Sequence, residues 1–397
     1  MPSAREIFLR HLAPTSSAPM MLEVESAEGT LITDTGGKKY IDLISGISVS
    51  SLGHNHPEIK KAIIRQLDKH AHVMVYGEFI QSPQNDLAEL LCSLLPSTLN
   101  SCYFVNSGGE AIEGALKLAK RFTGRYEIMA FRNAYHGSTA GALSLMSDAF
   151  FKDAFRPLVP GIKWMDFGNT SQLHLITENT AAVVFEFVQA EAGALTADES
   201  FFKALKNRCT ETGTLLIADE IQTGMRRTGK LFAFEHYGII PDILVLAKAF
   251  GGGMPLGAFI ADRKIMQSLS DNPPLGHITT FGGHPVSCAA AAASLKIISG
   301  ISEKEIDERE NLFRQKLVHP SIIKITGKGL LLGIEFENAE LCRQVIKQCI
   351  SNGIITDWFL FAPQKLRIAP PLNISMQEIQ TACTFILTSI NTVTSKT

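Results

Sequence analysis

The sequence predicts an α/β fold with a large, mainly parallel sheet and a smaller, discontinuous α+β domain. Between Ser101 and Asp262, short apolar runs alternate with segments of helical periodicity, which is typical of parallel strands joined by covering helices. The runs are continuously apolar, as expected of strands buried on both faces. After about Ser287 the pattern changes to a long charged helix followed by further strands, which indicates a second domain.

The expected elements follow from these runs in chain order. Strands of the large sheet are expected at residues 102–105, 128–131, 181–188, 214–218, 243–247 and 256–260. The smaller domain should contain a helix at 303–313 and strands at 329–336 and 366–368. The opening segment has a turn at 36–40 between strand-like runs and is expected to pack onto that domain. We therefore predict that residues 1–50 and 287–397 form the small domain and residues 51–286 the large one.

Length and composition exclude several classes of protein. At 397 residues the chain is long enough for two domains. Its formal net charge of -2 argues against a nucleic-acid partner, because such proteins usually carry a basic excess. The sequence has neither a leader-like start nor a stretch of about 18 uncharged apolar residues, so no membrane association or export is expected. The seven cysteines show no paired spacing, which favours reduced thiols in the cytoplasm over disulfides or zinc.

A glycine turn follows the first apolar run of the large sheet. Ligands of open parallel sheets collect beyond the carboxyl ends of the strands, and Ser107, Gly108 and Gly109 lie there, before a helical pattern. Backbone amides at a helix N-terminus bind anions, and glycines allow a phosphate to approach closely. The alternative is an ordinary turn with an N-capping serine. A Walker loop is excluded because no Gly-Lys-Ser/Thr follows.

Two charged residues lie at the ends of other apolar runs. Lys248 follows the run 243–247 and precedes a glycine-rich segment; lysine is rarely buried, and a desolvated amine becomes a nucleophile for a carbonyl group. Asp219 follows the run 214–218, where a buried carboxylate requires a cation or hydrogen-bond donors. The structural alternatives are a solvated side chain for Lys248 and a helix N-cap for Asp219.

Tyr135, after the run 128–131, is the fourth candidate, because an aromatic ring can stack on a flat ligand, although such a residue often belongs to the core. A phosphate-binding turn, a carboxylate, a lysine and a stacking ring at the strand ends of one sheet are the components of a pyridoxal phosphate site. The sequence therefore predicts pyridoxal 5'-phosphate as the cofactor.

His54 and His56 have no third ligand at suitable spacing, so we predict no metal.

The same residues resemble the motifs of a known family. In chain order these are Asn106-Ser107-Gly108-Gly109-Glu110-Ala111, Tyr135-His136-Gly137, Glu186 with Gln189 and Glu191, Asp219-Glu220-Ile221-Gln222-Thr223-Gly224, Lys248 and Thr280-Phe281-Gly282-Gly283-His284-Pro285. Over nearly its whole length the sequence is similar to class III aminotransferases. The resemblance implies the pyridoxal-phosphate type I (aspartate-aminotransferase-like) fold and a homodimer whose subunits share their active sites.

The resemblance also implies a role for each site residue. Lys248 would bind the cofactor covalently and then shuttle a proton, and Asp219 would pair with the pyridinium nitrogen; these two are the expected catalytic residues. The other expected cofactor-binding residues are Ser107, Gly108 and Gly109 at the phosphate, Tyr135 stacked on the ring, Gln222 at the ring hydroxyl, Glu186, and Thr280, which would reach the phosphate in the site of the other subunit.

The substrate site implied by the resemblance contains Arg367, which would bind an α-carboxylate, and Glu191, which would cover that arginine when the donor has no carboxylate there. Two positions depart from the family. Ile47 stands where ornithine-specific members tend to have tyrosine, and Ser138 replaces an arginine that helps to hold the distal part of the donor. We therefore expect an ω-amino donor of the 4-aminobutyrate or N-acetylornithine type, with 2-oxoglutarate as acceptor.

Two other functions could use the same cofactor. An aminomutase or a racemase would share the fold and the lysine, but the presence of Arg367 and Glu191 favours transamination between two substrates. A cofactor-binding regulator without catalysis is disfavoured by the intact Lys248 and Asp219.

Overall fold

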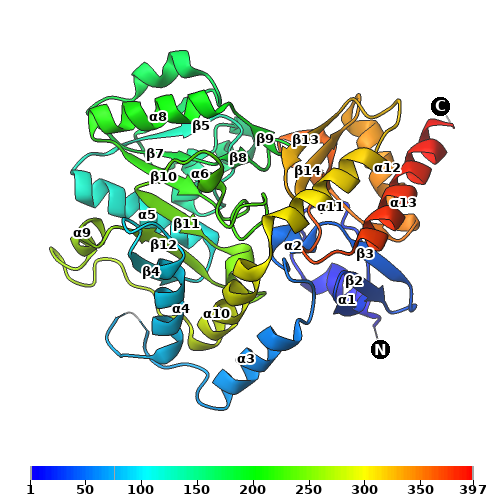
Figure 1. Ribbon diagram of the computed structural model, residues 1–397, viewed down its shortest axis with the longest axis horizontal. Helices are drawn as coiled ribbons and strands as arrows, with labels where there is room; N and C mark the ends of the chain where they lie inside the picture. Colours follow the sequence, from blue (N-terminus) through cyan, green and yellow to red (C-terminus); the bar gives the residue numbers. More distant parts are fainter. Residues whose placement is uncertain (1, 76, 396–397) are drawn as a thin grey trace.

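The computed structural model describes residues 2–75 and 77–395. Two lobes lie side by side in Figure 1: a larger one around a seven-stranded sheet, and a smaller one that contains two four-stranded sheets and both chain termini. The larger sheet has the strand order β4-β12-β11-β10-β7-β5-β6. Its strands are β4 (Ser101–Val105), β5 (Glu127–Phe131), β6 (Ile162–Met165), β7 (Thr180–Phe185), β10 (Leu215–Asp219), β11 (Ile243–Leu246) and β12 (Gly257–Ala261).

The prediction of a mainly parallel sheet is confirmed. The strand β12 is antiparallel to both of its neighbours, β11 and β4, whereas the other neighbouring strands are parallel. The direction of β12 is not encoded in its apolar run, so sequence reasoning did not single it out. As a result, the carboxyl ends of β4, β5, β7, β10 and β11 lie along one edge of the sheet.

The central strands are buried on both faces. In β10, Leu216 and Ala218 belong to one hydrophobic core, while Leu215 and Ile217 belong to another on the opposite face. The buried face of α5 (Gly108–Thr123) closes this second core. Burial on both faces is the physical reason why the runs in the sequence are continuously apolar.

The smaller lobe combines segments from both ends of the chain. Its sheets have the orders β13-β14-β17-β16 and β1-β2-β3-β15. In the second sheet, Ile354 of β15 pairs in parallel with Ile41 of β3, so the opening segment is hydrogen-bonded to the C-terminal one, as expected. The strands are β1 (Val24–Glu28), β2 (Leu31–Asp34), β3 (Lys39–Asp42), β13 (Lys324–Lys328), β14 (Leu331–Glu335), β15 (Ile354–Ile355), β16 (Trp358–Phe359) and β17 (Ala362–Ile368). The domain boundaries at residues 50 and 286 stay predictions.

The helices cover both lobes (Figure 1). They are α1 (Ala4–His11), α2 (Ser45–Ser48), α3 (Pro57–Leu67), α4 (Ser82–Ser93), α5, α6 (Ala140–Leu145), α7 (Ala149–Lys152), α8 (Glu199–Thr212), α9 (Arg263–Met266), α10 (Pro285–Gly300), α11 (Glu303–Lys316), α12 (Ala339–Ser351) and α13 (Met376–Thr394). Helix α10 packs against α3 and α4, and α11 and α12 pack against α13.

Several expected elements differ in extent from the observed ones. The expected strand 366–368 is the end of the longer strand β17, Ala362–Ile368. The expected strand 181–188 ends as β7 at Phe185, and β8 (Val188–Gln189) forms a separate ribbon with β9 (Leu195–Thr196). The expected strand 329–336 is shorter, because Gly329 lies in the turn before β14 with a φ of +61°, where a Cβ would lie 2.6 Å from the Arg227 carbonyl oxygen. The expected helix 303–313 continues to Lys316.

In residues 2–75 and 77–395, no single helix combines the length and the apolarity needed to cross a membrane. Helices α10 and α11 reach those criteria only when taken together, and the chain bends by 77° between them.

Candidate active site

A cavity of about 670 Å³ opens where the carboxyl ends of the parallel strands meet. Eight residues predicted from the sequence contribute to its wall: Ser107, Gly108, Gly109, Tyr135, Glu186, Asp219, Gln222 and Lys248. The other lining residues are Val49, Asn106, His136, Gly137, Ser138, Thr139, Ile221, Ala247, Gly253, Met254, Pro255 and Leu256. The eight predicted residues come from five separate segments of the sequence, which meet in one space as the strand-end argument predicts.

The turn after β4 forms the N-terminus of α5 at the cavity wall. The Ser107 side chain is the N-cap and accepts a hydrogen bond from the Glu110 backbone at 3.2 Å. A Cβ at Gly108 would lie 2.8 Å from the Ile221 side chain, and one at Gly109 would lie 3.0 Å from the Thr139 side chain. The capping interpretation of Ser107 is thus correct. It is compatible with anion binding, because the other backbone amides in the first turn of α5 have no acceptor within the helix, and this end of the helix lies at the cavity.

Asp219, the last residue of β10, is buried and bound to a histidine. Its Oδ2 lies 2.7 Å from His136 Nδ1, and its Oδ1 accepts a hydrogen bond of 3.0 Å from the Ile221 backbone. The described chain forms turns rather than a helix after Asp219, so Asp219 is not a helix N-cap. Sequence reasoning assigned no role to His136, although its place directly after Tyr135 at the exit of β5 was an available signal.

Lys248 follows β11 and begins a short 3-10 helix, Lys248–Gly251. Its φ of 51° lies in the left-handed region that residues other than glycine rarely adopt. Residues with such strained backbones cluster at functional sites. Burial lowers the pKa of the Lys248 amine, while the charge of Glu191 opposes the shift. A larger fraction of this amine is therefore neutral and nucleophilic than for a solvated lysine.

Two further polar residues complete the wall near Asp219. Glu186 accepts hydrogen bonds from the Ala190 backbone at 3.2 Å and the Tyr135 backbone at 3.4 Å. Burial and the neighbouring Asp219 raise the pKa of Glu186 well above its ordinary value. The buried Nε2 of Gln222 has no hydrogen-bond partner among the described residues, which leaves a donor available to a ligand in the cavity.

Tyr135 and Ser138 lie on the loop after β5. The Tyr135 hydroxyl is 3.1 Å from the Ser138 hydroxyl, and both residues line the cavity. Among the described residues that line the cavity, Lys248 is the only arginine or lysine, so this wall has no arginine in place of the one that Ser138 replaces.

Arg367 on β17 is buried beside the cavity rather than in its wall. Its Nη1 and Nη2 donate to the two Glu191 oxygens at 2.8 and 3.0 Å. Its Nε lies 2.9 Å from Asp357 Oδ1. Both ion pairs of Arg367 are buried rather than at the surface, because the Arg367 side chain is only 3% exposed. Sequence reasoning missed Asp357, whose signal was a single acidic residue within the apolar segment 354–359.

Thr280 and Ile47 also lie outside this cavity wall, as Arg367 and Glu191 do. Thr280 is exposed and does not line the cavity. Ile47 has a φ of 60° and is half-buried, and its neighbour Val49 lines the cavity instead. Within residues 2–75 and 77–395, no cluster of three potential metal-ligating His, Cys, Asp or Glu side chains occurs; His54 instead pairs with Asp42 at 2.8 Å.

The chain is similar to known proteins over most of its length. Residues 12–390 match the family model of aminotransferase class III. The chain is 36% identical over 386 residues to acetylornithine aminotransferase of Methanopyrus kandleri, covering 96% of each protein. It is 38% identical over 372 residues to putrescine aminotransferase of Pectobacterium atrosepticum, covering 89% of this chain and 78% of that protein. Among solved structures, ornithine aminotransferase of Toxoplasma gondii superposes with a TM-score of 0.91 at 28% identity, covering 100% of this chain and 97% of that one.

Proposed function

Because the chain belongs to the class III aminotransferases, we propose that it transfers the amino group of an ω-amino donor, of the 4-aminobutyrate or N-acetylornithine type, to 2-oxoglutarate. The enzyme is a transferase that depends on pyridoxal 5'-phosphate, as do the members of its family and its structural neighbours. The observation that carries the two-substrate proposal is the closed pair of Glu191 and Arg367 beside the cavity that contains Lys248.

The residues present fit the cofactor. Gly108 and Gly109 leave room that a side chain would fill at the start of α5, where a phosphate is stabilised by backbone amides. The unpartnered Nε2 of Gln222 supplies a donor for the ring hydroxyl. Asp219, held by His136, supplies a negative charge for the ring nitrogen. Each of these residues would thus have the role that the sequence predicts for it.

The chemistry is divided between the cofactor and the protein. When bound, pyridoxal phosphate accepts the electron pair that remains after the donor carbon loses its proton. With the cofactor bound, Asp219 would keep its ring nitrogen protonated, which would strengthen this capacity. Lys248 would hold the cofactor, and its amine, which burial makes partly neutral, would accept the proton from the donor carbon and carry it to the carbon of the cofactor that takes it up.

The Glu191–Arg367 pair accommodates two kinds of substrate in turn. Burial opposes ionisation of Glu191, but the charge of Arg367 and its two hydrogen bonds lower the pKa of that carboxyl. While the pair is closed, the site suits a donor without a carboxylate at this end. When Glu191 turns away, the same two N–H groups bind the α-carboxylate of the 2-oxo acid as a bidentate pair.

A diamine donor is the second candidate. The cavity wall contains no arginine, so a distal carboxylate of the donor has no fixed cation there. The related protein that is 38% identical over 372 residues is a putrescine aminotransferase.

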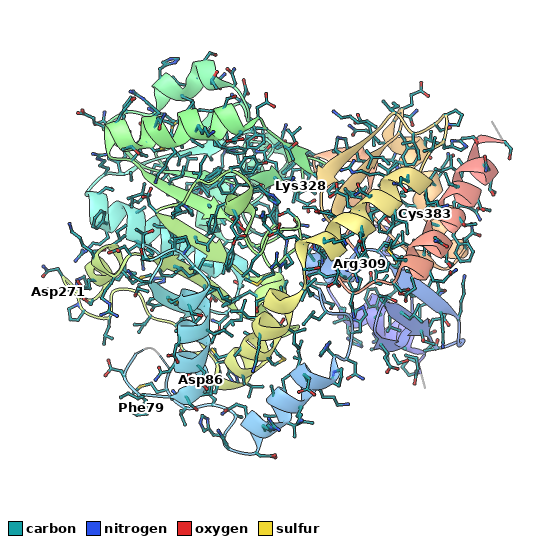
Figure 2. The ribbon with its side chains drawn as sticks, in the orientation of Figure 1. Phe79, Asp86, Asp271, Arg309, Lys328 and Cys383 are labelled. Atoms are coloured by element: carbon teal, nitrogen blue, oxygen red, sulfur yellow. The ribbon has the colours of Figure 1, made fainter. Side chains whose placement is uncertain are left out.

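We further propose a homodimer that acts in the cytoplasm. Apolar side chains are exposed on the loops before α4 and before α10, with Phe79 56%, Ile80 93% and Phe281 53% exposed. The His72 and Phe281 rings have centroids 4.8 Å apart and planes tilted by 43°, and this contact joins the two loops into one surface. Phe79 lies at the periphery of the molecule in Figure 2. An exposed apolar surface of this kind favours subunit contact, and it includes Thr280. The seven free cysteines favour a reducing compartment.

A half-reaction experiment tests the function. Holoenzyme mixed with a donor alone should lose the visible absorption of the lysine-bound cofactor, and 2-oxoglutarate should restore it. A panel of 4-aminobutyrate, N-acetylornithine and putrescine, each tested with 2-oxoglutarate and with pyruvate, identifies the pair. Isomerisation of the donor without an acceptor would indicate an aminomutase or a racemase, and a cofactor-bound protein that converts no amine would indicate a regulator.

A further inference from the structure

We propose that Asp357 is a positioning residue that keeps the Arg367 guanidinium aimed at the active site while its carboxylate partner changes from Glu191 to the substrate. This inference rests on the proposed exchange at Arg367 and adds a residue to it. It follows from the way in which the five N–H groups of Arg367 are distributed over their partners.

The two carboxylates occupy different parts of the guanidinium. Glu191 takes the end formed by Nη1 and Nη2, at 2.8 and 3.0 Å. Asp357 lies 2.9 Å from Nε, at the side of the group. Glu191 can therefore leave without removing the Asp357 contact, and the end that it vacates is the one suited to bidentate carboxylate binding.

The segment that carries Asp357 contacts Arg367 at several other points. The Trp358 carbonyl accepts from Nη2 at 3.0 Å, and the guanidinium carbon lies 4.5 Å from the centre of the Phe359 ring. The backbone of Arg367 donates to the Asp357 carbonyl at 2.9 Å, and its carbonyl accepts from the Thr356 hydroxyl at 2.6 Å. Consecutive residues of one segment thus frame the arginine, and Asp357 is the only charged group among them.

The contribution of Asp357 is orientation rather than attraction. Glu191 and a substrate carboxylate carry the same charge, so exchanging one for the other leaves the charge around Arg367 unchanged. Without Asp357, however, no carboxylate would hold the Nε side of the guanidinium in place once Glu191 departs. The Asp357–Arg367 contact is an ion pair rather than an aligned hydrogen bond, since neither Nε nor Oδ1 has a hydrogen-bond partner in residues 2–75 and 77–395.

Burial raises the pKa of Asp357 to about 6, although the charge of Arg367 opposes the shift. The carboxyl is thus mainly ionised at neutral pH. The Asp357 side chain is 22% exposed and that of Arg367 is 3% exposed, so replacing Asp357 removes a contact at the edge of the core rather than within it.

Binding of a dicarboxylate to the holoenzyme tests the proposal without turnover. Calorimetry with glutarate, which cannot react, should show binding weakened about tenfold in Asp357→Ala, within the range that misplacement of a binding group causes. Asp357→Asn retains an oxygen that can face Nε and should show a smaller loss, about threefold. Unchanged glutarate affinity in Asp357→Ala, or no glutarate binding by the wild-type holoenzyme, would overturn the proposal.

Half-reactions separate positioning from a merely structural role. In Asp357→Ala the rate with 2-oxoglutarate should fall, whereas the rates with the donor and with butanal, an acceptor without a carboxylate, should stay within about twofold. Equal losses with both acceptors, or a lowered melting temperature in Asp357→Asn with loss of all three rates, would show that Asp357 only supports the fold. If the wild-type enzyme converts no donor, the proposed function fails, while the glutarate measurement still decides the role of Asp357.

Discussion

His136 Nδ1 lies 2.7 Å from Asp219 Oδ2, and both side chains are almost completely buried. The pair joins the loop after β5 to the end of β10, so two strands separated by β7 jointly fix one carboxylate. The other ring nitrogen, His136 Nε2, is buried without a partner among the described residues. An imidazole in this place restricts the orientation in which Asp219 faces the cavity.

Replacing His136 should weaken cofactor binding. In His136→Ala, Asp219 loses one of its two side-chain hydrogen bonds and can rotate away from the ring nitrogen. A lost buried hydrogen bond to a charged group corresponds to about 1.5–3 kcal/mol, so the cofactor dissociation constant should rise about tenfold or more. Equilibrium titration of the apoenzyme measures it. His136→Asn, whose amide can take the place of Nδ1, should recover part of the affinity, and equal affinities in all three proteins would contradict the role.

Lys248 should be the residue that binds the cofactor. Lys248→Ala should lose the visible absorption of the lysine-bound form and turnover together, whereas Lys304→Ala, whose side chain is 85% exposed, should keep both. Borohydride reduction of the holoenzyme followed by peptide mapping locates the adduct directly. An adduct on any other lysine would refute the assignment of Lys248.

The pH dependence of cofactor rebinding should report the lowered pKa of Lys248. The shift is caused by burial and is opposed by the charge of Glu191. Because the neutral amine attacks the aldehyde, the rate of cofactor rebinding to the apoenzyme should rise with pH and level off at high pH. The midpoint of this rise should lie below the ordinary lysine pKa of 10.5. Stopped-flow absorbance measures the rate at each pH.

Substitution of Glu191 sharpens this test. Glu191→Gln removes the largest opposing charge and leaves Arg367 with Asp357 as its one remaining carboxylate partner, and both effects lower the pKa of Lys248. The midpoint should therefore move to a still lower pH, whereas Glu178→Gln, an exposed position, should leave it unchanged. A midpoint that moves upward in Glu191→Gln would contradict the electrostatic account.

Arg227 should contribute strongly to the stability of the fold. It is 1% exposed and donates to the carbonyls of Leu330 at 3.0 Å and Pro370 at 2.5 Å and to the Ser51 hydroxyl at 2.8 Å. Arg227→Ala leaves these buried oxygens without a donor, at about 1–3 kcal/mol each. Urea unfolding should therefore show a loss of about 3 kcal/mol or more.

The matched control for Arg227 is an exposed arginine. Arg343 forms an i,i+3 ion pair with Glu340 at 2.8 Å, with side chains 51% and 63% exposed. Arg343→Ala should change the free energy of unfolding by less than about 1 kcal/mol. Similar losses in the two variants would mean that the buried contacts of Arg227 do not determine its effect.

The strand-end argument predicted most of the cavity wall but not its internal connections. Ser107, Asp219 and Lys248 each follow a continuous apolar run, so their position at the carboxyl edge could be inferred from one segment at a time. The contacts of His136 with Asp219 and of Asp357 with Arg367 join distant segments, and no local pattern encodes them. The direction of β12 escaped prediction for the same reason, since an apolar run is identical in either direction.

Ser138 should limit the use of donors that end in a carboxylate. It lines the cavity beside the Tyr135 hydroxyl and is exposed, so a longer side chain can extend from it without displacing the core. Ser138→Arg adds a fork that can bind a distal carboxylate by charge-assisted hydrogen bonds, which contribute about 1.5–3 kcal/mol.

The KM for N-acetylornithine or 4-aminobutyrate should therefore fall about tenfold or more in Ser138→Arg, while the KM for putrescine should rise because two cations repel each other. Steady-state kinetics with saturating 2-oxoglutarate measure both values. Ser138→Gln, which adds length without charge, separates the electrostatic effect from the steric one. If Ser138→Gln and Ser138→Arg change the two KM values alike, the charge at position 138 does not select the donor, and the distal end of the substrate must be held by other residues.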